Sequence, residues 1–270
     1  MKSARFLLAG VTLATCFVMQ AVHAETLNFG IIEGMRFNKV QIGYFGNASA
    51  IETVDRGNGE VFAKVKYKSG EAGYYSVLVT NVNSKWKTID QILKNTREIN
   101  LGFGDPNSTS GMLVPSYYLF SKNGISVRND FKNVLPSNHE ANMLAVVNNR
   151  VDVATNNTTM ATLKKEHPER FAQLRVLWTS PLILSDPLVW RRDLPQATKD
   201  KLRNFFDHYA QSDPREKVIM DAITGYAGFE PSSDAQFVPI RPNGAVPEKA
   251  TGAERREYLG RGQKSATRGA

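Results

Sequence analysis

A strand that ends in a run of hydroxyl residues and leads into a helix is the feature that most constrains this chain. Residues 99–103 are typical of a short buried strand, Gly-Asp-Pro at 104–106 interrupts it, and apolar residues then return at helical spacing. Ser108, Thr109 and Ser110 therefore fall where a helix should begin. The first N–H groups of a helix have no partner within it and carry the positive end of its dipole, so this segment can bind an oxyanion. The alternative is an ordinary N-cap, for which one hydroxyl is enough.

The N-terminus is predicted to be a cleaved secretory signal. Lys2 and Arg5 precede a long apolar run, and Val-His-Ala at 22–24 supplies the small residues that a signal peptidase reads. We therefore expect export and removal of residues 1–24, with no later segment long enough to span a membrane. Cys16 could be a lipid-attachment site, but apolar residues follow it, which favours cleavage. Its removal would leave neither a disulfide nor a cysteine nucleophile.

The charge of the chain does not indicate a nucleic-acid-binding protein. Lys and Arg number 34 against 26 Asp and Glu, and the predicted signal carries two of the basic residues. Much of the remaining excess lies in the last thirty residues, so no basic face is indicated. A mature length of about 245 residues suits two lobes with separate cores.

Strand-like apolar runs alternate with helical patterns, which predicts an α/β fold with a mostly parallel sheet. Thr88 and Gln91 have the spacing of a capping box at the start of a short helix. A longer helix is expected over residues 139–149. The expected strands are residues 26–32, 40–45, 77–80, 99–103, 151–154 and 174–178, followed by an extended stretch from 182 to 190.

An amphipathic helix is predicted from Leu194 and Pro195 onward. Its apolar face is expected to lie in the core and consists of Leu202, Phe205, Phe206 and Tyr209. We expect Trp178 and Trp190 to be packing residues rather than platforms on which a ligand stacks.

Four motifs give the chain a close resemblance to a known family. They are GMRFNKV at 34–40, GDPNSTSG at 104–111, VATNNT at 153–158 and SDPLVW at 185–190. In these stretches the chain resembles the periplasmic phosphonate-binding proteins of ABC importers, and the likeness runs from about residue 27 to residue 241. It implies a two-lobed α/β periplasmic solute-binding protein, type II-like, that closes on its ligand about a hinge. It also implies no catalysis, no cofactor and no metal, with an ABC permease of the inner membrane as partner.

The resemblance divides the chain into lobes. Residues 25–76 and 186–240 would form lobe 1, and residues 77–185 would form lobe 2. Residues 241–270 would be a disordered tail, because glycine is frequent and large apolar residues are scarce there.

The resemblance implies six ligand-binding residues, which are Tyr74, Ser108, Thr109, Ser110, His139 and Asp186. The three consecutive hydroxyl residues would hold the phosphonate oxygens, with helix amides beside them, while the tyrosine and the histidine close the other sides. The aspartate would face the organic end of the ligand, where a carboxylate can pair with an ammonium group. The structural alternatives are a helix cap for the histidine, and a cap or hinge hydrogen bond for the aspartate.

Thr159 departs from the family pattern. Relatives that bind aminoalkyl phosphonates carry a Glu after the Asn-Asn-Thr run, where this chain has Thr159. A hydroxyl cannot neutralise an ammonium group. We therefore expect an unsubstituted or alkyl phosphonate to compete better with aminoethylphosphonate here than in those relatives.

A second departure predicts a truncated lobe 1. Relatives place a helix, a second strand and a tyrosine loop between the first strand and the GMRFNKV motif. Only residues 33–39 connect the two expected strands here, whereas a parallel βαβ unit takes about 30 residues or more. Loss of an edge strand and a helix would uncover apolar sheet surface and remove one wall of the ligand cleft.

Three alternatives to a phosphonate receptor follow from these departures and from the hydroxyl residues. The chain could be a remnant that binds weakly or not at all, or a receptor for phosphite or phosphate. It could also be a phosphate-ester hydrolase with Ser108 or Ser110 as nucleophile and His139 as base. That enzyme would lack both a Gly-x-Ser-x-Gly elbow and a His/Asp cluster with metal spacing.

Overall fold

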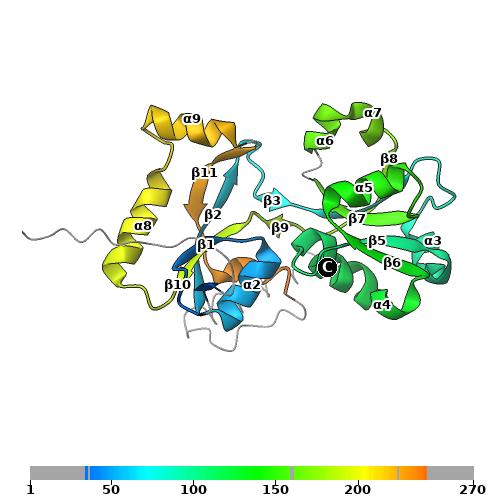
Figure 1. Cartoon of the computed structure of the whole chain (residues 1–270), viewed down its shortest axis with the longest axis horizontal. Coiled ribbons are helices and arrows are strands. Elements are labelled where there is room, and N and C mark those ends of the chain that lie inside the picture. The colour runs from blue at the N-terminus through cyan, green and yellow to red at the C-terminus, as the bar shows by residue number, and fades with distance from the viewer. Residues whose placement is uncertain (1–33, 36, 159–160, 224, 242–270) are drawn as a thin grey trace, which may run out of the picture.

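The protein is an α/β molecule of two lobes (Figure 1). Its computed structural model describes residues 34–35, 37–158, 161–223 and 225–241. The lobes are joined by two short crossing strands, β3 (Gly73–Tyr74) and β9 (Ile183–Leu184), which pair antiparallel. The predicted two-lobed α/β class is confirmed. The predicted signal peptide, the strand expected over 26–32, Thr159 and the tail from residue 242 lie outside the described residues.

Lobe 1 is the body built on the sheet ordered β1, β10, β2, β11. These strands span Ile42–Tyr44, Pro187–Arg191, Gly59–Tyr67 and Tyr226–Pro231. Each neighbouring pair among them is antiparallel, so the expectation of a mostly parallel sheet is wrong for the described part of lobe 1. The reason is that β10 returns from lobe 2 and enters between β1 and β2 in the opposite direction. Because β10 lies far from β1 and β2 in the sequence, no local sequence pattern predicts the direction in which it runs beside them.

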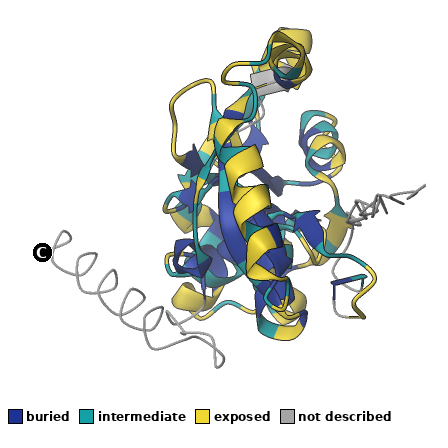
Figure 2. Ribbon diagram, turned by 90° about the vertical axis from the view of Figure 1, so that its left-hand side faces the viewer, coloured by how far each residue is buried: buried dark blue, intermediate teal, exposed yellow. Residues whose placement is uncertain are grey.

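Helices α2, α8 and α9 belong to lobe 1, and they span Asn47–Arg56, Gln196–His208 and Pro214–Ala222. Figure 2, seen from the side of α8, shows exposed outer helix faces with buried strands behind them. Phe206 packs edge-on against Phe62, which stacks on Trp190 with ring centroids 4.1 Å apart. Phe205 was predicted to be core but is 49% exposed, because the face of α8 that meets the sheet is centred on Leu202 and Phe206.

Lobe 2 is the body built on the sheet ordered β6, β5, β7, β4, β8. These strands span Asn133–Ser137, Asn100–Gly104, Val153–Asn157, Ser76–Asn81 and Leu174–Thr179. β5 pairs parallel with β6 and β7, whereas β4 pairs antiparallel with β7 and β8. Among the described strands of this sheet, β4 alone runs against the others, so the parallel prediction holds around β5 and fails at β4.

Short helices connect the strands of lobe 2. The predicted capping box is confirmed, since the Thr88 hydroxyl accepts the Gln91 N–H and the Gln91 side chain accepts the Thr88 N–H. Trp178 packs against the cores of both lobes, and Trp190 is buried, as predicted. None of the described helices is long and apolar enough to cross a membrane. The helices are α3 (Ile89–Lys94), η1 (Thr96–Glu98), η2 (Thr109–Leu113), η3 (Ser116–Phe120), η4 (Ser121–Asn123), α4 (Val127–Asp130), α5 (His139–Val147), α6 (Ala161–Glu166) and α7 (Pro168–Phe171), with η6 (Asp234–Phe237) in lobe 1.

Candidate functional site

Helix η2 follows β5 and begins within the run of hydroxyl residues, as the sequence predicted. Ser108 is its N-cap, and the Ser108 hydroxyl accepts the N–H of Gly111 at 3.0 Å. The Ser108 carbonyl accepts from Met112 and also from Leu113, and the bond from Leu113, five residues further on, makes the wide turn of a π-helix. A Cβ on Gly104 would lie 2.4 Å from the backbone of Gly111, so the turn requires glycine there. The N-cap alternative therefore applies to Ser108.

The three consecutive hydroxyl groups have different partners. The first caps η2, as described. The Thr109 hydroxyl oxygen accepts the N–H of Ala48, in α2 of lobe 1, at 2.8 Å. The Ser110 hydroxyl lies 3.2 Å from Nε2 of His139 and accepts from the Asn157 amide at 3.4 Å. Thr109 and Ser110 are 4% and 2% exposed, so both lie inside the protein, and Thr109 touches the opposite lobe.

His139 is the first residue of α5, behind Ser110. Its neighbour Asn138 is the N-cap, which accepts the Ala141 N–H at 2.8 Å, so His139 does not cap the helix. Burial lowers the pKa of His139, against an opposing effect of the Thr155 backbone. Nδ1 is buried and makes no hydrogen bond of ordinary geometry within the described part of the chain. The imidazole is therefore neutral at neutral pH and can share Nε2 with Ser110 as donor or acceptor.

Tyr74 and Asp186 meet where the chain crosses between the lobes. The Tyr74 hydroxyl donates to Oδ1 of Asp186 at 3.2 Å, and the Asn47 side chain donates to the same oxygen at 3.0 Å. Burial raises the pKa of Asp186 from 3.8 to about 6, against the hydrogen bonds from Tyr74 and Asn47. Burial and the charge of Asp186 raise the pKa of Tyr74 well above its usual value, against hydrogen bonds from Asn47 and Thr109. Tyr74 thus stays protonated, while Asp186 titrates near pH 6.

The site includes Asn47 and Gln236, which sequence reasoning missed. Asn47 is fully buried at the start of α2 and also donates to the Leu184 carbonyl at 2.8 Å. Its oxygen accepts from the Gln236 side chain at 2.8 Å. One signal in the sequence could have indicated Asn47: a strand followed by Gly46 and a helix start resembles the arrangement of strand, glycine and helix that leads into η2. These amides tie the hinge carboxylate to lobe 1.

Two tyrosines beside the hinge were also missed. The hydroxyls of Tyr44 and Tyr226 lie 2.7 Å apart, although their strands are at opposite edges of the lobe 1 sheet. Burial and the charge of Asp186 raise the pKa of Tyr44. Because the two residues lie 182 positions apart, no local pattern predicts that they meet.

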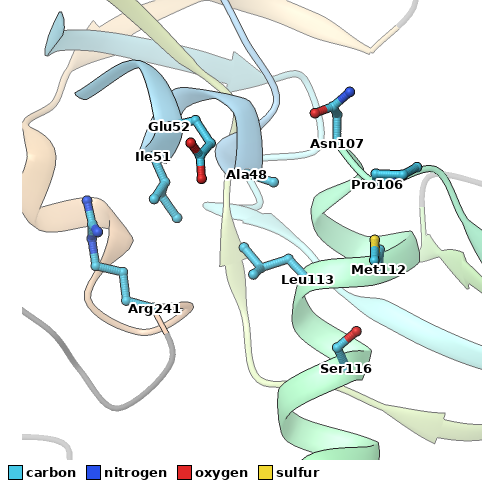
Figure 3. Close-up of a pocket in the computed structure, with 9 residues that line it drawn as sticks. All are labelled: Ala48, Ile51, Glu52, Pro106, Asn107, Met112, Leu113, Ser116 and Arg241. Atoms are coloured by element: carbon cyan, nitrogen blue, oxygen red, sulfur yellow. The ribbon is translucent and has the colours of Figure 1, made fainter. Parts of the chain in front are cut away.

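A groove of about 280 Å³ lies beside these residues, between α2 and the helices that begin at η2 (Figure 3). None of the six predicted ligand residues lines it. Ile51, Met112 and Leu113 give it apolar walls, and Glu52 and Arg241 lie at its lobe 1 side. Arg241 is bound by Asp55 in a bidentate ion pair. The groove is therefore distinct from the polar cluster around Thr109, Ser110 and Asp186.

The cluster is suited to holding an anion rather than to nucleophilic catalysis. Ser110 and His139 have the spacing of a nucleophile and a base. Nδ1 of His139 has no carboxylate to orient the ring in the described part of the chain. Residues 34–35, 37–158, 161–223 and 225–241 also contain no group of His, Cys, Asp and Glu that could hold a metal ion. What the cluster does offer is hydroxyl and amide donors at the start of a helix.

A comparison of families identifies the chain. The profile of the family described as "ABC transporter, phosphonate, periplasmic substrate-binding protein" matches residues 19–237. The chain belongs to this family. Membership implies a periplasmic location, and the resemblance deduced from the motifs is confirmed.

Curated relatives of this family member include proteins named for two related anions. It is 51% identical over 213 residues to the phosphonates-binding periplasmic protein of Escherichia coli K12, covering 78% of the chain and 62% of that protein. It is 26% identical over 185 residues to a probable phosphite-binding protein of Prochlorococcus marinus, covering 66% of the chain and 61% of that protein. The chain thus spans less than two thirds of the length of these relatives.

Solved structures share the fold of this family member. A binding protein component of an ABC phosphonate transporter from Pseudomonas aeruginosa matches with a TM-score of 0.71 and 42% identity, covering 89% of this chain and 85% of that one. A Prochlorococcus marinus protein, solved in complex with methylphosphonate, matches with a TM-score of 0.61 and 23% identity, covering 76% and 78%. The second match supports the fold alone.

Proposed function

We propose that this protein is the receptor of an ABC importer, which captures phosphonate in the periplasm and presents it to a permease of the inner membrane. One observation carries the proposal: the buried hydroxyls of Thr109 and Ser110 lie at the start of η2, where lobe 2 meets lobe 1. Family membership and the E. coli relative support phosphonate as the cargo. Because the chain covers 62% of that relative, binding has to be measured on this chain itself.

The proposed oxyanion contacts use the protons that the three hydroxyls retain. A hydroxyl oxygen that accepts an N–H bond still has its own proton to donate. Ser108 and Thr109 accept from Gly111 and Ala48, so each can turn its proton toward a phosphonate oxygen. Ser110 would add a further donor when the neutral His139 donates its Nε2–H to the Ser110 oxygen, which leaves the hydroxyl proton for the ligand. Hydrogen bonds to a charged group contribute about 1.5 to 3 kcal/mol each, so four or five could leave micromolar or tighter affinity after desolvation.

Tyr74 and Asp186 are proposed to close the other end of the site. Tyr74 stays protonated and donates to Asp186, whose carboxylate can face the organic group of the ligand. Together with Thr159, this favours a compact alkyl phosphonate over one that carries an ammonium group. A single carboxylate with a raised pKa is a weaker partner for a cation than two carboxylates.

The organisation of the chain around this site is part of the proposal. We place residues 25–76 and 186–240 in lobe 1 and residues 77–185 in lobe 2, with cleavage of the signal after Ala24. We also propose that lobe 1 is shortened after its first strand. The support for shortening is the short connection over 33–39, which is too brief for a βαβ unit.

Phosphite or phosphate is the second candidate cargo, and one relative favours it. The Prochlorococcus marinus protein at 26% identity is named as a probable phosphite-binding protein. Hydroxyl and amide donors would recognise the oxygens of either anion equally. The hydrolase alternative has less support, because the family consists of substrate-binding proteins and the His139 ring lacks an orienting carboxylate among the described residues.

The test is calorimetric titration of the full chain with methylphosphonate, aminoethylphosphonate, phosphite and phosphate. We expect methylphosphonate to bind and to raise the melting temperature, because a ligand that binds only the folded form stabilises it. Ser110→Ala should weaken methylphosphonate binding by about tenfold to a hundredfold, since it removes a hydrogen bond to a charged group. The matched control is Ser121→Ala, at an exposed serine of η4 in the same lobe.

Three results would contradict the proposal. If none of the four anions binds or raises the melting temperature, the chain is a remnant rather than a receptor. Tighter binding of phosphite than of methylphosphonate would favour the second cargo. Turnover of a chromogenic phosphate ester that Ser110→Ala abolishes would favour the hydrolase.

A further inference from the structure

Within the described part of lobe 1, no side chain caps the N-terminus of α2. Its N-cap residue is Gly46, which has no side chain to accept a hydrogen bond, and the first turn has no acidic residue. Gly46 has extended backbone angles, φ −61° and ψ 151°, that a serine adopts readily. The first N–H groups of this ten-residue helix therefore need an acceptor from elsewhere.

That acceptor comes from the opposite lobe. The Thr109 hydroxyl oxygen takes the Ala48 N–H at 2.8 Å, across 61 residues of sequence. Thr109 is 4% exposed, so the bond is shielded from water. A Cβ added to Gly46 would meet the Thr109 hydroxyl at 3.8 Å, an ordinary contact distance, so α2 and η2 are already in close packing. The start of one lobe's helix is thus capped by the other lobe.

The same stretch of α2 also reaches the hinge. Tyr74 donates to Asp186, and Asn47, next to Ala48, donates to the same carboxylate oxygen. Two neighbouring residues of α2 therefore contact Thr109 of lobe 2 and the carboxylate of Asp186.

We propose that the Ala48 N–H is a positioning donor that couples lobe closure to anion capture through Thr109. When the lobes meet, the Ala48 N–H donates to the oxygen of the Thr109 hydroxyl, and the single proton of that hydroxyl is then directed into the site. When the lobes part, the hydroxyl loses this orientation and α2 loses its cap. The inference rests on the proposed function where it concerns the ligand, but the capping of lobe 1 by lobe 2 stands without it.

The first experiment needs no phosphonate. Amide hydrogen exchange of Ala48 is measured in the wild-type chain, in Thr109→Val and in Thr109→Ser. An N-cap contributes about 1 kcal/mol, so we expect exchange of Ala48 to be about fivefold faster in Thr109→Val and close to wild type in Thr109→Ser. Melting temperatures show whether each variant is folded. Equal exchange in folded Thr109→Val and in wild type would overturn the proposal.

The second experiment separates positioning from mere contact. Gly46→Ser offers α2 a cap of its own that competes with Thr109, and Gly46→Ala is the matched control with a Cβ but no hydroxyl. We expect Gly46→Ser to be at least as stable as Gly46→Ala, yet to bind methylphosphonate about fivefold more weakly. Small-angle scattering without methylphosphonate should show a more extended average shape for Gly46→Ser. Equal affinities and equal scattering for the two variants would refute the coupling.

The two proposals fail in different ways. If the wild-type chain binds no methylphosphonate, the proposed function fails, while Ala48 exchange and scattering still decide whether Thr109 holds α2 to lobe 2. If methylphosphonate binds but the amide exchange rate of Ala48 is the same in wild type and Thr109→Val, the proposed receptor function is retained and the proposed coupling is wrong.

Discussion

Replacing Asp186 by asparagine should stabilise the protein at neutral pH and leave it unchanged in acid. The pKa of Asp186 is raised from 3.8 to about 6, and burial is the largest cause. Between these two values the folded protein holds a proton that the unfolded chain has already lost, so stability falls as pH rises from about 4 to about 6. The rise of the pKa from 3.8 to about 6 corresponds to about 3 kcal/mol of folding free energy, by which the ionised Asp186 destabilises the protein above pH 6.

Asp186→Asn removes this cost without removing the hydrogen bonds. The amide oxygen of asparagine can still accept from Tyr74 and Asn47, which both bind Oδ1 of Asp186. We expect Asp186→Asn to be more stable than wild type by up to about 3 kcal/mol at pH 7.5 and equal to it at pH 4.

The assay is urea unfolding of wild type and Asp186→Asn at intervals from pH 4 to 8. Asp200→Asn, at an exposed position of α8, controls for the loss of one negative charge. The reasoning is refuted if the stability difference between wild type and Asp186→Asn does not change across this range, or if it grows toward acid.

The remaining predictions concern His139, the turn before η2 and the choice of ligand. Burial lowers the pKa of His139, so below about pH 6.5 the unfolded chain takes up a proton that the folded protein does not. The melting temperature of wild type should therefore fall more than that of His139→Gln when the pH is lowered from 7.5 to 5. The control is His208→Gln, at an exposed histidine of α8. Gly104→Ala should cost about 2 kcal/mol or more in urea unfolding, since its Cβ would lie 2.4 Å from the Gly111 backbone. Gly46→Ala, whose Cβ would have no atom of the described residues nearer than 3.8 Å, should change stability little, and equal effects would contradict the steric argument. Methylphosphonate should compete better against aminoethylphosphonate than it does in relatives with a Glu after the Asn-Asn-Thr run, and strong preferential binding of aminoethylphosphonate in calorimetry would count against this.

Local signals predicted the elements that build lobe 2's part of the site. The capping box at Thr88, the strand ending at Gly104 and the helix from His139 all depend on residues within a few positions of one another. Cap chemistry and apolar periodicity act at that range, so they can be read from the chain. The run of hydroxyl residues marked where a helix begins, but only the structure decided that Ser108 takes the cap of η2.

Other features depend on contacts between remote segments. The direction of β10 is set by its entry between β1 and β2 after the chain has passed through lobe 2. The meeting of Tyr44 with Tyr226 and of Asn47 with Gln236 likewise joins residues more than 180 positions apart. Because long-range pairing is decided by the packing of whole lobes, no short pattern predicts it.

The sequence by itself determined the family, the α/β class and the position of the hydrogen-bond donors at the start of η2. The reason is that motifs and helix starts depend on residues that are close together in the chain. Only the tertiary structure decided what each donor does. Three adjacent hydroxyls that look equivalent in the chain cap their own helix, cap a helix of the other lobe, and meet a buried neutral histidine. The physical reason is that a hydroxyl binds whichever partner the fold brings within about 3 Å, and for Thr109 that partner belongs to lobe 1.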